Sequence, residues 1–183
     1  MQTLYTLIIF SENLAGVLNT VINVFTRRML NIESLSVNQS GTEGIHRYTL
    51  TCKTDEDTIK LVTKQIEKKV DVIKAQYFTT DQVYVMEQAL YKIATPRLLE
   101  NREISKAIRL YDGKMVEVNP TYTIVSKEGL PEEITALYER IKAADCLLQF
   151  VRSGIVAVTK AEREELLEFL DLREIHRMAQ QQS

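Results

Sequence analysis

Two histidines and two cysteines are the side chains in this sequence best suited to proton transfer or nucleophilic attack at neutral pH. His46 falls in a predicted strand beside Arg47, and His176 falls in a predicted helix near the C-terminus. Neither histidine has a Ser or Cys nucleophile, or a carboxylate, at the spacing of a catalytic motif. Cys52 and Cys146 lie far apart in apolar stretches, which predicts buried, reduced core thiols rather than a disulfide or a metal site. We therefore expect no catalytic residue and no metal site in this chain.

Motifs for phosphate or nucleic-acid chemistry are also missing. The sequence contains neither GxGxxG nor GxxxxGK[ST]. Its formal net charge of -2 argues against a nucleic-acid partner, which would require a concentrated basic face. An RNA-binding sheet would need several exposed aromatic side chains, whereas the strand-like run Ile45–Cys52 offers only Tyr48. Acylphosphatase-like chemistry would need an arginine in the stretch Ser11–Leu18, which has none. These features favour a protein that is not an enzyme.

The stretch SENLAGVLN, Ser11–Asn19, has residue types that suit the binding of a small metabolite. It follows the apolar run Thr3–Phe10 and opens a predicted helix. A helix N-terminus leaves backbone N–H groups without partners and carries partial positive charge, so it suits a carboxylate. Gly16 would let the backbone approach a ligand, and Asn13 can accept a hydrogen bond from an ammonium group. The apolar residues of the stretch would surround an apolar ligand side chain: Leu14, Val17 and Leu18. A free amino acid presents all three of these groups.

A packing turn is the alternative interpretation of the same stretch. In that case Asn13 caps the helix, and Gly16 allows the helix to pack closely on a sheet. Taken alone, the residues of this stretch favour the packing turn over a ligand site.

The elements around this stretch predict an α+β fold of two consecutive ferredoxin-like βαββαβ domains. In the first predicted domain, residues 1–79, two helices with apolar stripes alternate with strand-like runs. Within Asn31–Val37, strict alternation would place Ile32 on the opposite face from Leu35 and Val37. The predicted strands are Thr3–Phe10, Asn31–Val37, Ile45–Cys52 and Val70–Phe78.

The second predicted domain, residues 80–160, repeats this order of elements. Its last strand, Cys146–Thr159, is bent at Ser153-Gly154. The other predicted elements are the strands Val83–Ala94, Lys114–Val118 and Thr121–Val125, one helix from Thr95 to about Tyr111, and one helix from Pro131. The helical tail, residues 161–183, contains a charged helix, Glu162–Ala179, whose thin apolar stripe suits packing either on the parent domain or on a partner.

No stretch of the sequence approaches the ~20 apolar residues of a membrane span. The N-terminus lacks a basic region followed by an apolar region, so no signal peptide is visible. We therefore expect a cytoplasmic protein that does not contact a membrane.

Two motifs taken together resemble a known family. ENLAGVL, Glu12–Leu18, is followed by NIESLSV, Asn31–Val37, and this combination is similar to the ACT domain of the acetolactate synthase small subunit, also called the acetohydroxyacid synthase regulatory subunit. The resemblance reaches residue 162 and follows the family's order. The further similar stretches are Lys68–Lys74, Gly113–Val125 and Val151–Lys160.

The resemblance implies a regulatory subunit with an N-terminal ACT domain and a C-terminal ferredoxin-like domain. It implies a homodimer whose ACT sheets join side by side, with a branched-chain amino acid, usually valine, bound at that interface. By motif match, the loop Asn13–Leu18, which includes Ala15, comes from one chain, and Asn31 and Ile32 come from its partner. The catalytic large subunit would hold thiamine diphosphate, Mg²⁺ and FAD, and this chain would bind no cofactor. It would activate the large subunit and confer feedback inhibition by the amino acid.

The sequence departs from the family pattern at two positions. Ala15 replaces a frequent proline before the loop glycine, and Met29 replaces a common glycine two residues before Asn31. Because a bulky residue disfavours the left-handed conformation, Met29 predicts a different exit from the first helix. A free-standing ACT-type amino-acid sensor, serving another enzyme or a transcription regulator, is the alternative function.

Overall fold

The computed structural model describes residues 2–163 and 166–172, and these fall into two compact units. The first unit comprises the residues up to Tyr84 together with those from Ala157 onward, and the second is Val85–Val156. The predicted domain limits at 79/80 and 160/161 lie a few residues from these divisions. In the predicted tail helix Glu162–Ala179, residues 166–172 are helical. Residues 164–165 and 173–179, with His176, lie outside the described residues.

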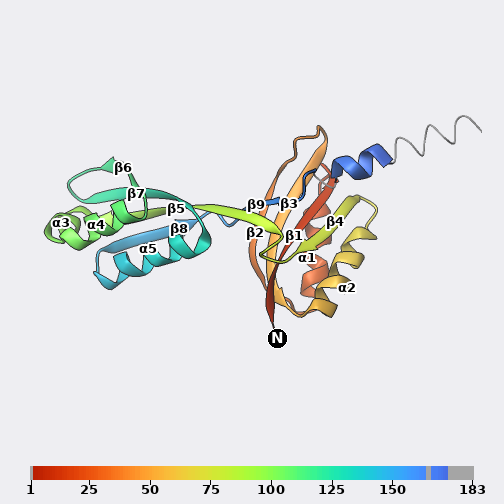
Figure 1. Ribbon diagram of the computed structural model, residues 1–183, viewed down its shortest axis with the longest axis horizontal. Helices are drawn as coiled ribbons and strands as arrows, with labels where there is room; N and C mark the ends of the chain where they lie inside the picture. Colours follow the sequence, from red (N-terminus) through yellow and green to blue (C-terminus); the bar gives the residue numbers. More distant parts are fainter. Residues whose placement is uncertain (1, 164–165, 173–183) are drawn as a thin grey trace, which may run out of the picture. The chain divides into compact units, whose positions relative to one another are not determined.

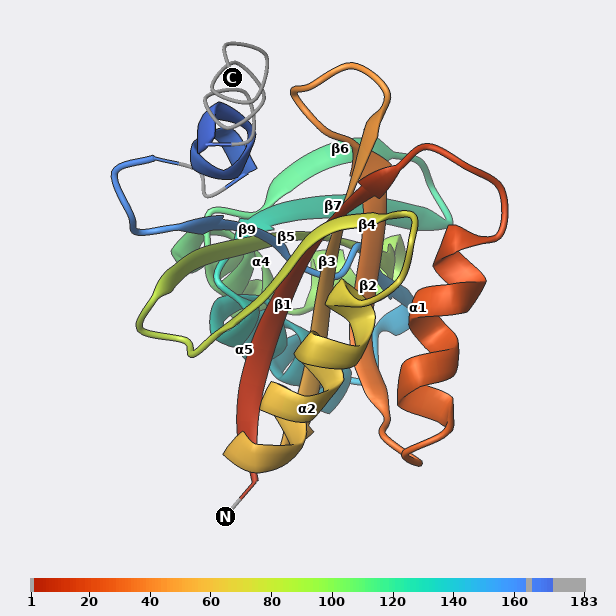
Figure 2. The same ribbon diagram turned by 90° about the vertical axis from the view of Figure 1, so that its right-hand side faces the viewer.

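The first unit contains a four-stranded antiparallel sheet with two helices on one face (Figure 1 and Figure 2). Its strand order is β2-β3-β1-β4. The strands are β1 (Thr3–Glu12), β2 (Ile32–Gln39), β3 (Ile45–Thr54) and β4 (Val72–Phe78), and the helices are α1 (Val17–Thr26) and α2 (Glu56–Glu67). This is the predicted ferredoxin-like βαββαβ order, and it leaves β2 and β4 as the edge strands of the sheet.

The core of the first unit lies between this sheet and its two helices. Leu7 and Ile9 of β1 point to this core, whereas the alternate residues Ile8 and Phe10 belong to the opposite face of the sheet. The helices contribute apolar side chains at helical spacing: Val17, Val21, Val24 and Phe25 from α1, and Ile59, Val62 and Ile66 from α2. Burial of this stripe, rather than helix propensity, stabilises such short helices.

The alternation predicted for the second strand is wrong at its start. The register of β2 against β3 shifts between Ile32 and Ser34, so Glu33 is an extra, bulged residue. Ile32 therefore pairs with Cys52 and packs against the core on the same side as Leu35 and Val37.

The second unit repeats the βαββαβ order around a sheet with strand order β6-β7-β5-β8, and β9 also pairs with β5. The strands on this path are β5 (Val83–Ala94), β6 (Lys114–Val118), β7 (Tyr122–Gly129) and β8 (Leu147–Arg152). The strand β9 (Val156–Thr159) begins at the last residue of this unit and belongs to the first unit from Ala157 onward. The helices α3 (Thr95–Glu100), α4 (Arg102–Leu110) and α5 (Pro131–Ala143) supply the core together with β5, β7 and Cys146. The predicted fold class is confirmed.

Two predicted elements of this unit are divided in the structure. The single helix from Thr95 to Tyr111 is broken at Asn101, whose backbone is extended and whose Oδ1 accepts a hydrogen bond from Glu103 N at 3.0 Å. An asparagine side chain that caps a new helix competes with continuation of the old one. The bent last strand forms β8 and β9, separated by Gly154, which has a φ of 77°.

The described residues after β9 lie against the face of the first sheet that is turned away from α1 and α2. Arg47 packs over the Phe10 ring and donates from Nη2 to the Ala157 carbonyl at 2.7 Å. On the neighbouring strand, Lys74 lies 5.8 Å from the centre of the Phe169 ring. Leu166 is fully buried. Part of the tail is therefore packed on the parent domain, one of the two alternatives that the sequence leaves open.

No helix within the described residues is long and apolar enough to cross a membrane.

Candidate functional site

The loop between β1 and α1 is held by backbone hydrogen bonds to two neighbouring turns. Glu12 N donates to Asp71 O and Asn13 N donates to Gly44 O, both at 3.0 Å. Beyond these anchors, the side chains of Asn13, Leu14 and Ala15 are exposed. The loop is thus fixed at its base and open to solvent at its tip.

Gly16 begins α1 in the left-handed region, with a φ of 91° and a ψ of -14°. A Cβ added there would meet no atom within 4 Å. Close packing of the helix on the sheet, one part of the packing-turn interpretation, therefore does not explain this glycine. The backbone conformation does, because a left-handed φ is strained for residues with a Cβ.

The N-terminus of α1 has no side-chain cap. The N-cap position belongs to Gly16 rather than Asn13, and the first turn carries no acidic residue. This arrangement contradicts the prediction that Asn13 caps the helix. By contrast, Asp55 caps α2 through a 2.9 Å hydrogen bond from Thr58 N, and hydrogen bonds from Thr58 lower the pKa of the Asp55 carboxyl. The first N–H groups of α1 remain available to an external acceptor such as a carboxylate.

The apolar side chains of the loop divide into two groups. Leu14 is 54% exposed and Leu18 is 38% exposed, so both can contact a ligand or another chain. Val17 is only 2% exposed and belongs to the core, so it can offer its backbone N–H but not its side chain.

Met29 adopts the left-handed conformation that its side chain disfavours, with a φ of 54°. Leu30 N donates to Phe25 O at 3.1 Å and Met29 N donates to Thr26 O at 3.0 Å. These two bonds form a Schellman motif, which Leu30 completes by packing against the core that contains Phe25. The predicted change in the helix exit is therefore wrong, because the methionine takes the backbone conformation usually held by glycine.

Asn31 and Ile32 lie at the opposite end of the sheet from the loop. Ile32 pairs with Cys52, and Cys52 pairs with Tyr5 near the start of β1, whereas the loop follows Glu12 at its end. At ~3.3 Å per residue, these levels of the sheet are about 23 Å apart. One chain therefore does not bring the two halves of the predicted site together.

The other chemically reactive side chains occupy structural positions. Cys52 and Cys146 are free and buried, as predicted. Burial, with a smaller effect from Glu33, raises the pKa of the Cys52 thiol to about 11, and burial also raises the pKa of Cys146. His46 pairs with Ser11 in the sheet. Within the described ranges, no three His, Cys, Asp or Glu side chains gather closely enough to hold a metal ion.

A second surface feature was missed from the sequence. A groove between α1 and α2 is lined by four cations: Arg27, Arg28, Lys68 and Lys69. The sequence carries a signal for the groove in two adjacent basic pairs, each directly after a helix. Cations at a helix end also complement the helix dipole, so these pairs do not by themselves predict a groove.

Comparisons with known proteins agree on both halves of the chain. Residues 7–74 match the family described as "AHAS small subunit-like ACT domain", and residues 86–161 match "Small subunit of acetolactate synthase". A probable acetolactate synthase small subunit of Methanothermobacter thermautotrophicus is 32% identical over 152 residues, covering 83% of this chain and 90% of that protein. The acetolactate synthase small subunit of Haemophilus influenzae is 28% identical over 155 residues, covering 85% and 94% of the two chains.

A solved structure extends the agreement to three dimensions. The acetolactate synthase small subunit of Thermotoga maritima superimposes with a TM-score of 0.78 at 26% identity, and the match covers 87% of this chain and 99% of that one. The fold and the uncapped, glycine-initiated loop thus define a protein with an ACT domain followed by a second ferredoxin-like domain. The chain belongs to the family of acetolactate synthase small subunits.

Proposed function

We propose that this chain is the regulatory subunit of an acetolactate synthase. In this role it activates the catalytic large subunit, which holds thiamine diphosphate, Mg²⁺ and FAD, and it makes that subunit sensitive to feedback inhibition by valine. The observation that carries the effector site is the start of α1, where Gly16 leaves the first N–H groups uncapped and accessible. Membership in the small-subunit family supports the large subunit as the partner.

The proposed effector complements the loop group by group. The carboxylate accepts hydrogen bonds from the N–H groups at the start of α1, where the helix dipole favours negative charge. The ammonium group donates to the Asn13 side chain, and the branched side chain contacts Leu14 and Leu18. Asn31 of a second copy closes the site.

A two-fold dimer through β2 would supply that second copy. β2 is an edge strand whose start lies level with Tyr5 and whose end, Gln39, lies level with Ser11. Antiparallel pairing of β2 with its two-fold mate places the start of one strand beside the end of the other. Asn31 of one protomer would then approach the loop end of its partner, which is the end that it cannot reach within its own chain.

Feedback requires more than tight binding of the effector. Valine must bind the inhibited arrangement of the complex better than the active one, since a ligand with equal affinity for both shifts neither. A coupling free energy of ~1–3 kcal/mol, or about 5- to 150-fold in affinity, is ordinary for such a system.

The test combines binding and activity. Calorimetric titration of the chain with valine, leucine and isoleucine measures affinity, and an acetolactate synthase assay of the large subunit, with and without the chain and each amino acid, measures activation and inhibition. We expect activation by the chain and strongest inhibition by valine. Absence of both amino-acid binding and activation would overturn the proposal.

The alternative of a free-standing amino-acid sensor is opposed by the second half of the chain. Residues 86–161 match the acetolactate synthase small-subunit family, and a general sensor would not need this domain. Pull-down with the thiamine-dependent large subunit distinguishes the two functions, because only the regulatory subunit should retain it.

A further inference from the structure

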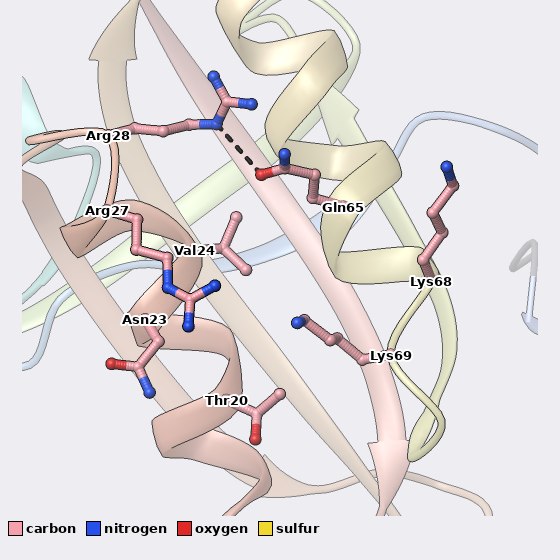
Figure 3. Close-up of a pocket in the computed structure, with 8 residues that line it drawn as sticks. All are labelled: Thr20, Asn23, Val24, Arg27, Arg28, Gln65, Lys68 and Lys69. Carbon is pink, nitrogen blue, oxygen red and sulfur yellow. Dashed lines mark hydrogen bonds between the residues drawn. The ribbon is translucent and has the colours of Figure 1, made fainter.

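The groove between α1 and α2 concentrates positive charge on a chain whose formal net charge is -2. It has a volume of about 660 Å³. Arg27 and Arg28 come from the end of α1, and Lys68 and Lys69 come from the end of α2. Figure 3 shows Arg28 beside Gln65 at one end of the groove, and farther along it the Lys69 ammonium group projects across the groove toward α1, on the side of Arg27. We call this feature the basic groove.

Within the described part of the chain, the positive charges of the basic groove have no acidic partner. No carboxylate lines the groove, and none of its four cations forms an ion pair with another described residue. Arg28 Nε donates only to the neutral Gln65 amide, at 3.2 Å. The neighbouring Glu67 pairs instead with Lys74, at 3.0 Å. Elsewhere on α2 a lysine does have a partner, since Lys60 lies 2.6 Å from Glu56.

Helix-end electrostatics do not account for this arrangement. The end of α1 is already satisfied by the Schellman motif at Met29, and Lys69 N donates to Ile66 O at the end of α2. A cation in the last turn of a helix is stabilising, but the effect fades within one turn. Four cations along one groove repel each other, and a negatively charged occupant would relieve that repulsion.

The shape of the basic groove favours an extended occupant over a small metabolite. Its charged side chains are half-buried or exposed, and the buried Val24 provides little apolar surface for a bound ring or chain. Charge spread along an open groove suits an acidic segment of another protein. We propose that the basic groove receives an acidic segment of the large subunit. This inference rests on the proposed function and assigns a contact surface to it.

The experiment measures how tightly the full-length chain binds the large subunit as ionic strength changes. The test variant combines Arg27→Glu with Lys69→Glu. The matched control combines Arg102→Glu with Arg109→Glu, two exposed cations on α4 of the second unit that form no ion pair with another described residue. Affinity is read from titrations of activation at ionic strengths of about 0.05 and 0.3 M, between which the Debye length shortens markedly. Unfolding midpoints establish that both variants fold.

We expect the groove variant to bind at least ~10-fold more weakly than the wild type at low ionic strength and to lose most of its salt dependence. The milder double variant Arg27→Gln, Lys69→Gln should fall between them. The α4 control should bind within about twofold of the wild type, as expected for isolated surface charges.

Four outcomes would overturn the inference. Equal affinity of the groove variant and the wild type excludes the groove as a contact, and equal weakening in the α4 control indicates a general charge effect. If the groove binds pyrophosphate in calorimetry and its variants keep full affinity for the large subunit, the groove is a site for a small anion and not a contact with the large subunit. A wild-type chain that fails to bind the large subunit overturns the proposed function itself and this inference with it.

Discussion

Met29 shows how a single residue can hold a conformation unfavourable to its type. Its left-handed backbone is enforced by the two Schellman hydrogen bonds and by the packing of Leu30. Its side chain does not offset this strain by packing, since it is 90% exposed. The strain lies two residues before Asn31, where it fixes the path of the chain into β2.

Replacing Met29 with glycine should therefore stabilise the protein. The left-handed conformation costs ~1–2 kcal/mol for a residue with a Cβ, and the greater freedom of glycine in the unfolded chain offsets ~0.5–1 kcal/mol of the gain. We expect Met29→Gly to raise the free energy of unfolding in urea by about 0.5–1 kcal/mol. Met29→Ala, which keeps the strain, should match the wild type, and equal stability of the Gly and Ala variants would exclude backbone strain.

Gly16 permits a sharper test of the effector loop. An aspartate there would repel the effector carboxylate, whereas asparagine has nearly the same size and also tolerates the left-handed conformation. Because a hydrogen bond to a charged group contributes ~1.5–3 kcal/mol, Gly16→Asp should weaken valine inhibition at least ~10-fold and leave activation largely intact. The valine inhibition curve of Gly16→Asn should lie closer to that of the wild type. An unchanged curve for Gly16→Asp would show that the effector binds elsewhere.

At the scale of elements, β2 and the loop preceding α1 become one site only in a dimer. Gly16→Asp disables the loop and Asn31→Ala disables the other half. A dimer mixed from the two variants has one doubly altered site and one intact site. Mixed dimers should therefore regain valine binding, seen as up to one site per dimer by calorimetry, whereas each variant alone should bind weakly. Mixed dimers that stay inactive toward valine would show that the loop of one chain and Asn31 of the other do not form one site.

An ion pair links the strand β7 to the start of α5. Lys127, whose side chain is 5% exposed, donates to Glu133 at 2.8 Å and thereby lowers the pKa of that carboxyl below its ordinary 4.5. A carboxyl with a lowered folded pKa adds stability above its unfolded pKa and loses it as the pH falls through the folded value. Glu133→Gln should thus be less stable than the wild type at pH 7, and this difference in stability should be smaller at pH 3.

Urea unfolding at the two pH values measures this difference. The neighbouring Glu132, exposed and also in the first turn of α5, provides the control. Glu132→Gln should differ little from the wild type at either pH. A stability gap for Glu133→Gln that persists undiminished in acid would show that the Lys127 contact is not the cause.

Hydrophobic periodicity predicted nearly every helix and strand, because each buries one face in a core and its spacing is visible in the chain. It failed where a local backbone event changed the geometry. The bulge at Glu33 moved Ile32 to the core side, and the Asn101 cap divided one helix into two. For the site, residue types indicated the loop, but the left-handed backbone at Gly16 and the burial of Val17 depend on contacts made only after folding.

At the scale of the whole molecule, the first unit is built from both ends of the described chain. Leu166 is fully buried although it lies beyond the matched family region, which ends at residue 161. Leu166→Ala should destabilise the first unit by about 2–4 kcal/mol, as expected for a large-to-small change in a buried site. Hydrogen exchange should accelerate in β1 and β4 and remain unchanged in α5. Unchanged protection of β1 and β4 would show that the tail contributes no stability to the sheet.

The same discontinuity sets an order of events during protein synthesis. After Tyr84, the ribosome must make all of Val85–Val156 before Ala157 and the following helix can reach the first sheet. At ~5–20 residues per second this interval lasts roughly 4–15 s. During it, Phe10 and its neighbours on the face away from α1 and α2 lack the contacts that Arg47 makes with Ala157 and Lys74 makes with Phe169. The nascent chain thus passes through a stage at which a chaperone or a second nascent copy can reach a surface that the finished subunit covers.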